Sequence, residues 1–183
     1  MKLFAGEKIE KNKDNDPYGY DKVFSVPDDL QPKLDSGEEM SEKSVENMYN
    51  HIIEMEDAIK NIAEGTRKQD YPFDGYTHAY NVDYMHKMEA RKRAIEINYT
   101  VSLLPEQNKE KFVEWANKPE SEFDFDITVK GIFAQKLGAP EDMIKDSIVS
   151  LDRGLGEEGN QKMGEVVYDR MLGFLNEGDK KED

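Results

Sequence analysis

The residues of this chain best suited to metal chemistry are its three histidines and the carboxylates near them. Glu54 follows His51 by three residues, and Glu89 follows His86 by three, while His78 lies between the two pairs. A His–Glu pair at this spacing shares one helix face, and two such helices can hold a carboxylate-bridged metal. The alternative is that the pairs arise by chance on glutamate-rich helix surfaces. A metal-dependent enzyme is therefore the third hypothesis for this chain, and we expect no metal and no other cofactor.

The sequence offers few residues for nucleophilic catalysis or for binding a nucleotide cofactor. The chain has no cysteine, no Gly-x-Ser-x-Gly and no phosphate-binding Gly-x-x-x-x-Gly-Lys-Ser/Thr sequence. The segment Gly154–Gly159 fits Gly-x-Gly-x-x-Gly, but no strand is expected before it and its two glutamates would face the phosphates. We therefore predict a protein that is not an enzyme and has no catalytic residues.

The charge and the hydropathy of the chain indicate which class of partner it can bind. The formal net charge is −15, and charged residues make up 36% of the chain. This charge disfavours direct binding to nucleic acid or to anionic membranes. No apolar run approaches the roughly 20 residues that span a bilayer. We therefore expect a protein partner, with no membrane association and a thin hydrophobic core.

The strongest periodic pattern lies in residues 38–63. Apolar side chains recur there every three or four residues, as in an amphipathic helix that packs along one face. These residues are Val45, Met48, Tyr49, Ile52, Met55, Ile59 and Ile62. Ser36 with Glu39 fits a capping box before the helix, and Gly65 fits a stop after it.

The pattern of caps and breakers downstream predicts further helices and no convincing sheet. They are expected at 83–104, 105–118, 126–137 with Gly138 at its end, 140–151 and 161–176. A tyrosine-rich loop is expected at 65–82, and another loop at 152–160. The fold class is thus all-α, with about five or six helices.

The predicted organisation has three parts. Residues 1–37 read as an extended arm because Pro17, Gly19, Pro27 and Pro32 interrupt them. Residues 38–178 form the helical domain. Residues 179–183 form a frayed, acidic and disordered tail.

One stretch, residues 83–138, carries a set of spaced motifs. They are Asp83-Tyr84 opening a helix, Leu104-Pro105, Phe112 seven residues after that proline, Asn117-Lys118-Pro119, Phe123, Phe125 and a helix ending in Leu137-Gly138. In these motifs the stretch resembles the internal scaffolding proteins of small single-stranded DNA phages, the gokushovirus-type microviruses.

The stretch also departs from the pattern of that family. About three extra residues, Glu114 to Ala116, separate Phe112 from the Asn-x-Pro motif. Lys109 is the nearest counterpart of an arginine that the family usually carries between the proline and the phenylalanine. Residues 1–70 and 150–183 show no match.

The resemblance implies a function in capsid assembly. The chain would bind the major capsid protein, line the interior of the procapsid in the host cytoplasm, and be absent from the finished particle. Its partner-binding residues would be Tyr99, Phe112, Trp115, Phe123 and Phe125. The alternative is that these aromatic rings pack in the protein's own core. The scaffold hypothesis also predicts weak self-association.

The second hypothesis rests on the acidic surface. Carboxylates can occupy the nucleic-acid channel of a nuclease, and residues 112–183 carry 17 acidic and 9 basic side chains. A phage-encoded inhibitor of a nucleic-acid-processing enzyme is therefore the alternative function. The simpler interpretation of the charge is a solvated surface, since lysines lie among the acids.

Overall fold

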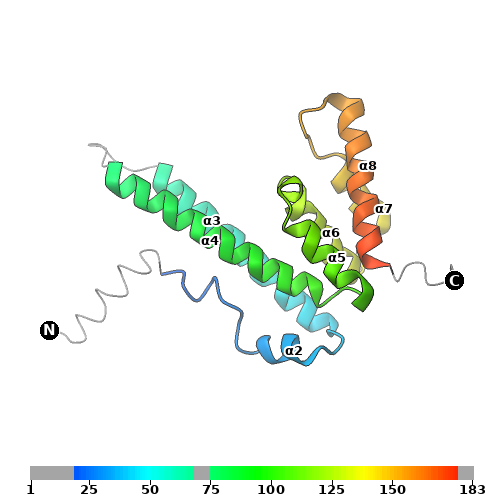
Figure 1. Cartoon of the computed structure of the whole chain (residues 1–183), viewed down its shortest axis with the longest axis horizontal. Coiled ribbons are helices and arrows are strands. Elements are labelled where there is room, and N and C mark those ends of the chain that lie inside the picture. The colour runs from blue at the N-terminus through cyan, green and yellow to red at the C-terminus, as the bar shows by residue number, and fades with distance from the viewer. Residues whose placement is uncertain (1–18, 68–74, 177–183) are drawn as a thin grey trace. The chain divides into compact units, whose positions relative to one another are not determined.

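The computed structural model describes residues 19–67 and 75–176, and this part of the chain is helical with no strand (Figure 1). The helices are α2 (Gln31–Ser36), α3 (Glu42–Arg67), α4 (Gly75–Val101), α5 (Glu106–Ala116), the 3₁₀ helix η1 (Pro119–Ser121), α6 (Phe125–Lys136), α7 (Glu141–Val149) and α8 (Gly156–Leu175). The all-α class expected from the sequence is confirmed. Residues 1–18 of the expected arm and the whole acidic tail lie outside the described residues. None of the helices in the described ranges has the length and apolar character that a bilayer crossing requires.

The chain divides into two compact units. Unit 1 comprises residues 1–32 and 48–95, and unit 2 comprises residues 33–47 and 96–183. Each of the long helices α3 and α4 therefore contributes one part to each unit. This differs from the organisation expected from the sequence, in which one helical domain follows a separate arm.

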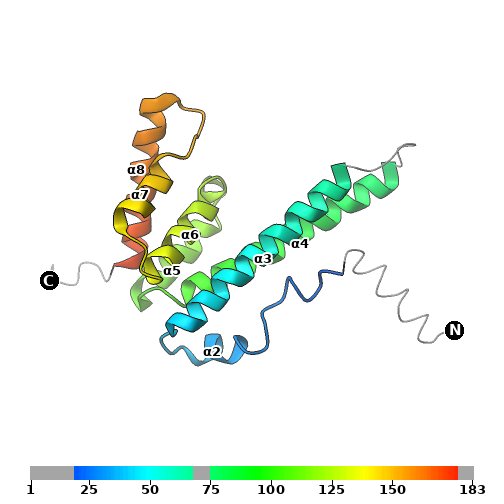
Figure 2. The same cartoon turned by 180° about the vertical axis from the view of Figure 1, so that it is seen from behind.

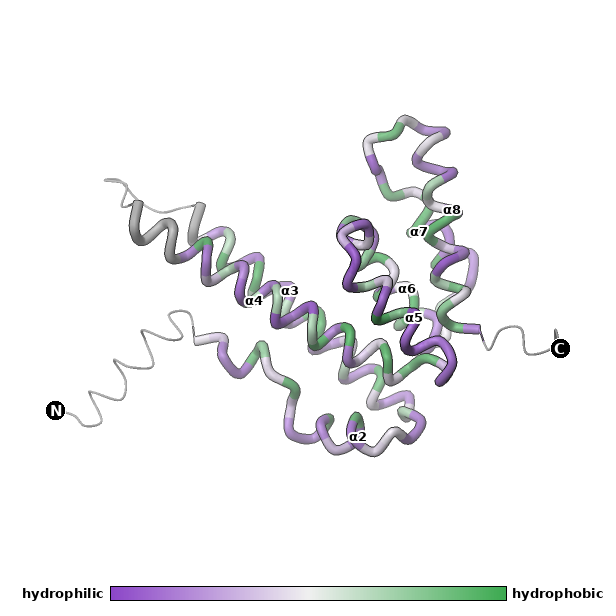
Figure 3. Tube along the Cα trace, in the orientation of Figure 1, coloured by the Kyte–Doolittle hydropathy of each residue, from purple (hydrophilic) through white to green (hydrophobic). Residues whose placement is uncertain are grey.

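Unit 1 is built on the antiparallel pair α3 and α4, which run side by side in both views (Figures 1 and 2). The stripe expected from the periodicity is buried: Met48, Ile52, Met55 and Ile62 have 0% exposure. From α4, Tyr84, Met88 and Ile95 are also buried. Polar and apolar residues are mixed along both helices in Figure 3, and of the two it is α3 that has the periodic apolar face of an amphipathic helix.

Residues 19–30 do not extend away from the molecule, contrary to the expectation for the arm. The backbone turns so that the Phe24 amide donates to the Tyr20 carbonyl at 3.1 Å, and the two rings meet edge to face. Phe24 and Leu30 are almost completely buried. The short helix α2, which proline content concealed, begins directly after Leu30. We call residues 20–30 the arm segment.

The start of α3 corrects the capping box expected at Ser36 and Glu39. The Ser41 hydroxyl accepts a 3.1 Å hydrogen bond from the Ser44 amide, which places Ser41 at the N-cap. Ser36 instead accepts from the amide of Glu38 and so helps to end α2. Gly37 has a φ of 73°, which lets the chain reverse between the two helices.

Unit 2 contains α5 to α8, and α8 packs against α5, α6 and α7. The end of α6 is the glycine stop expected from the sequence. Gly138 has a φ of 86°, and the Ala139 amide donates to the Ala134 carbonyl in a Schellman arrangement. Gly164 allows α8 to approach α7 closely, since a Cβ there would lie 2.6 Å from the Cα of Val149.

Two helices begin earlier than expected. α4 begins at Gly75 within the expected tyrosine-rich loop, because no proline or glycine interrupts residues 76–83. α8 begins at Gly156 instead of residue 161, and Glu157 and Glu158 favour a helix start through their interaction with the macrodipole. Glycine content had indicated the loop at 152–160, and aromatic residues around Pro72 and Gly75 had indicated the loop at 65–82. The remainder of the tyrosine-rich loop, residues 68–74, lies outside the described residues.

Candidate protein-binding surfaces

The aromatic residues expected to contact a partner fall into two groups in the structure. Tyr99, Phe112 and Phe125 have at most 1% exposure, and Trp115 has 8%. Phe123 is different, because 58% of it is exposed. Four of the five rings therefore lie in the protein's own core, which was the alternative interpretation of the sequence. Of the five, only the Phe123 ring lies largely on the surface.

Three of the buried rings join Phe174 of α8 in an aromatic cluster, formed by Phe112, Trp115, Phe125 and Phe174. Phe112 meets Phe174 edge to face with centroids 5.2 Å apart, and Trp115 stacks on Phe125 at 6.3 Å. Such geometries add to the stabilisation that burial alone provides. The cluster joins α5, α6 and α8. It therefore explains why residues 112–125 and α8, which are far apart in the sequence, belong to one unit.

Buried Asn108 connects α5 to the end of α8. Its side-chain amide donates to the carbonyls of Phe174 at 2.8 Å and Asn176 at 2.6 Å. The last carbonyls of a helix have no partner within the helix. Asn108 satisfies that of Phe174, contacts the Asn176 carbonyl just beyond the helix, and so fixes the C-terminal end of α8.

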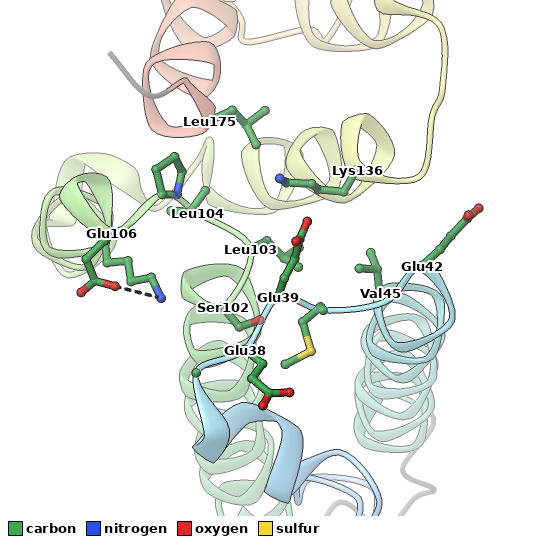
Figure 4. A pocket seen from close by; sticks show the side chains of 14 residues that line it. Glu38, Glu39, Glu42, Val45, Ser102, Leu103, Leu104, Glu106, Lys136 and Leu175 are labelled. Carbon is green, nitrogen blue, oxygen red and sulfur yellow. Dashed lines mark ion pairs between the residues drawn. The ribbon is translucent and has the colours of Figure 1, made fainter. Parts of the chain in front are cut away.

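A groove of about 570 Å³ lies in unit 2, where the loop before α3 meets the ends of α4, α6 and α8 (Figure 4). The buried side chains of Val45, Leu103 and Leu104 contribute apolar surface to its walls, together with Met40 and Leu175. The helix-ending segment Leu103-Leu104-Pro105 therefore supplies much of the apolar lining.

Carboxylates dominate the charge around the groove. Glu38, Glu39 and Glu42 are exposed at its edge, and Glu106 forms an ion pair with Lys109 at 3.6 Å. In Figure 4 the side chains of Glu39 and Lys136 both extend into the space above Leu103. With four acidic and two basic side chains in its lining, the groove is complementary to a segment that carries positive charge, and its buried leucines offer a smaller apolar contact.

The histidines proposed as metal ligands have different environments. His51 is buried, and its Nε2 lies 2.6 Å from the Val23 carbonyl oxygen, to which it donates. His86 is exposed on α4, as are Glu54 and Glu89 on their helices. His78 lies among residues whose side chains are not described. Across the described part of the chain, no group of three or more His, Asp or Glu side chains converges as a metal site.

Two aspartates at the start of α6, Asp124 and Asp126, have structural contacts within the fold. The Arg153 guanidinium donates from Nε to Asp124 at 3.3 Å, and both side chains are largely buried. This ion pair ties the loop after α7 to the start of α6. Asp126 lies in the first turn of α6, where a carboxylate favours the helix macrodipole.

Sequence reasoning missed the groove, because its lining comes from four separate segments of the chain. A local signal did exist: the acidic Gly-Glu-Glu-Met-Ser segment at 37–41 and the Leu-Leu-Pro segment at 103–105 each interrupt a helical pattern. Neither segment reveals that the other lies beside it.

The chain matches no protein-family model, no curated protein sequence and no solved structure.

Proposed function

We propose that this chain is a non-enzymatic assembly protein that binds a partner protein through the groove of unit 2. The supporting observation is the groove itself, with buried leucines beneath a rim of carboxylates. The motifs in residues 83–138 favour one partner, the major capsid protein of a gokushovirus-type phage. The chain would then act as an internal scaffold in the procapsid, within the host cytoplasm.

The shape and charge of the groove support a reversible contact. It is open along one side and lined by both polar and apolar groups, which suits a segment of a protein chain. Rim charges contribute mainly to association rate and specificity, and their effect weakens as salt rises. A scaffold must release its coat protein, and such contacts allow release.

Burial of the aromatic rings also bears on the mode of binding. Because Phe112, Trp115 and Phe125 stabilise unit 2, they are not available as anchors in a partner's pocket. The proposal therefore moves the contact from the aromatic residues to the groove. Phe123 remains a candidate for an additional, peripheral contact.

The test measures binding to a purified major capsid protein of this phage group, at low and high salt. Glu38→Gln/Glu39→Gln removes two charges from the groove edge. Glu110→Gln/Glu114→Gln removes two exposed charges from α5 outside the groove lining and is the matched control. We expect the first variant to bind at least severalfold more weakly at low salt, with the difference reduced at high salt. The control should bind like the unaltered chain.

Two results would contradict the proposal. Absence of capsid-protein binding by the unaltered chain would remove the scaffold function. Equal weakening by both variants would show that total charge, and not the groove, determines binding. Tight binding to a purified nuclease that nucleic acid competes away would instead support the acidic inhibitor.

A further inference from the structure

The arm segment is bound to α3 and α4 much as a peptide is bound to a receptor. Arg91 of α4 donates from Nη2 to the Phe24 carbonyl at 3.0 Å and to the Asp21 carbonyl at 3.3 Å. Its Nη1 lies 3.0 Å from the Asp21 carboxylate. From α3, His51 donates to the Val23 carbonyl. Two side chains of the helix pair thus bind three carbonyls of the arm backbone.

Two apolar anchors accompany these hydrogen bonds. Phe24 is 2% exposed and Leu30 is 1% exposed, although both lie in a segment with little regular structure. Full burial of side chains this large favours the bound position of the segment. The Asn61 amide adds a 3.1 Å hydrogen bond to the Tyr20 hydroxyl. The arm segment therefore has a defined binding site within unit 1.

The division between the two units falls within α2, just after the bound element. Unit 1 includes the chain up to Pro32, and Lys33 onward belongs to unit 2, where Lys33 donates to Ser44. Release of the arm segment therefore breaks contacts within unit 1 and leaves those of residues 33–47 intact. An element with its own binding site and a boundary of this kind can exchange between copies of a chain.

We propose that the arm segment of one copy of this chain binds α3 and α4 of a second copy, forming a dimer by reciprocal exchange. The occupant follows from the site, because the segment that the structure places there is this chain's own residues 20–30. The contacts formed between two chains on exchange are the same contacts that are broken within each chain. Exchange by itself therefore adds no new interface to stabilise the dimer. The dimer is therefore weak and depends on concentration.

This inference does not rest on the groove. It supplies a physical basis for the weak self-association that a scaffold requires, but it holds for any function of the chain. The groove variant Glu38→Gln/Glu39→Gln lies outside the arm site and should leave exchange unchanged. Failure of one proposal can thus be distinguished from failure of the other.

The experiment uses the absence of cysteine in the full chain. A Lys22→Cys chain carries a spin label on the exposed side of the arm segment, and it is mixed with an isotope-labelled chain that has no spin label. We expect amide signals near His51 and Arg91 of the isotope-labelled chain to broaden, increasingly with concentration. The matched control carries the label at Lys60→Cys, an exposed α3 position outside the arm.

Variants of the acceptor chain identify the site. Arg91→Ala in the isotope-labelled chain should abolish most of the broadening, and Arg91→Lys should weaken it because an ammonium does not span the same acceptors. Unchanged unit 2 signals would show that both variants fold. Three results would overturn the proposal: no broadening between chains up to millimolar concentration, equal broadening from the Lys60→Cys label, or broadening that Arg91→Ala leaves unchanged.

Discussion

Units 1 and 2 are both helical, but different interactions complete them. In unit 2 an aromatic cluster joins three helices, Asn108 connects α5 to the end of α8, and the polar contacts of the Asp152–Asn160 loop link residues close in sequence. In unit 1 the core is a stripe of methionine and isoleucine, and the arm segment is bound by side chains 28 to 70 residues away. Unit 2 therefore covers its core with its own helices, whereas unit 1 needs a separable segment.

The choice of apolar residue reinforces this difference. Unit 1 buries Met48, Met55 and Met88, and unbranched methionine adapts to changes in its surroundings. Unit 2 buries one methionine, Met171, and a cluster of rigid rings whose mutual angles matter. We therefore expect the core of unit 2 to tolerate substitution poorly and that of unit 1 to accept a change in what covers it.

The largest expected effect comes from the aromatic cluster. Phe112→Ala removes a ring with 0% exposure and should lower the free energy of unfolding of unit 2 by about 3–5 kcal/mol. Phe123→Ala is the control and should change it by about 0.5 kcal/mol or less, because that ring is 58% exposed. Urea denaturation combined with residue-resolved hydrogen exchange measures both effects.

Phe24→Ala tests the other side of the comparison. It should remove protection from the arm segment while α5 to α8 keep theirs, because Phe24 contributes to unit 1. If Phe24→Ala and Phe112→Ala each removed protection from both units together, the two units would unfold as one and the contrast between them would be lost.

A pair of glycines gives an intermediate effect within α8. Gly164→Ala places a Cβ 2.6 Å from the Val149 Cα and 3.2 Å from its carbonyl oxygen, so two helix backbones must separate. We expect a loss of about 1–3 kcal/mol. Gly173→Ala meets no atom within 4 Å and should instead stabilise the helix by about 0.5–1 kcal/mol. Thermal denaturation should give melting temperatures that move in opposite directions, and a decrease in both would show that α8 tolerates no added methyl group.

The contrast between the units also explains what the sequence could predict. Hydrophobic periodicity and helix-breaking residues are local features of a sequence. The sequence could therefore predict the apolar stripe of α3, the end of α6 at Gly138 and the prolines that precede α5 and α7. The binding of the arm was not, because Arg91 and the Phe24 carbonyl lie 67 residues apart. Proline content had indicated an extended arm, and burial of Phe24 and Leu30 overrides that tendency.

The candidate site was harder to predict for the same reason. An aromatic residue at helical spacing fits a core and an interface equally well, and the sequence had no means to separate Phe123 from Phe125. The structure separates them by exposure, 58% against 1%. The groove required Leu103 and Leu104 to lie beside residues 37–45, an arrangement that no local pattern encodes.

The smallest expected effect concerns the loop before α8 and depends on pH. The Asp152 carboxylate accepts hydrogen bonds from the Gly154 amide at 2.9 Å and from the Asn160 side chain at 3.0 Å, and these lower its pKa below 3.8. Because the folded state holds the proton less tightly than the unfolded state, the carboxylate stabilises the fold above pH 3.8. That contribution is lost as the pH falls through the pKa of the folded state.

Asp152→Asn should therefore lower the melting temperature slightly at neutral pH, and the difference from the unaltered chain should shrink as the pH falls below 3.8. Asp146→Asn makes the same charge change on an exposed position of α7 and is the control. A difference for Asp152→Asn that stayed constant from neutral to acidic pH would mean that the carboxylate charge does not stabilise this loop. In unit 1, the hydrogen bond from the Arg91 guanidinium to the Phe24 carbonyl does not depend on pH, because arginine stays charged and a carbonyl does not titrate. The contacts of Asp152 in unit 2 would then be equally independent of pH.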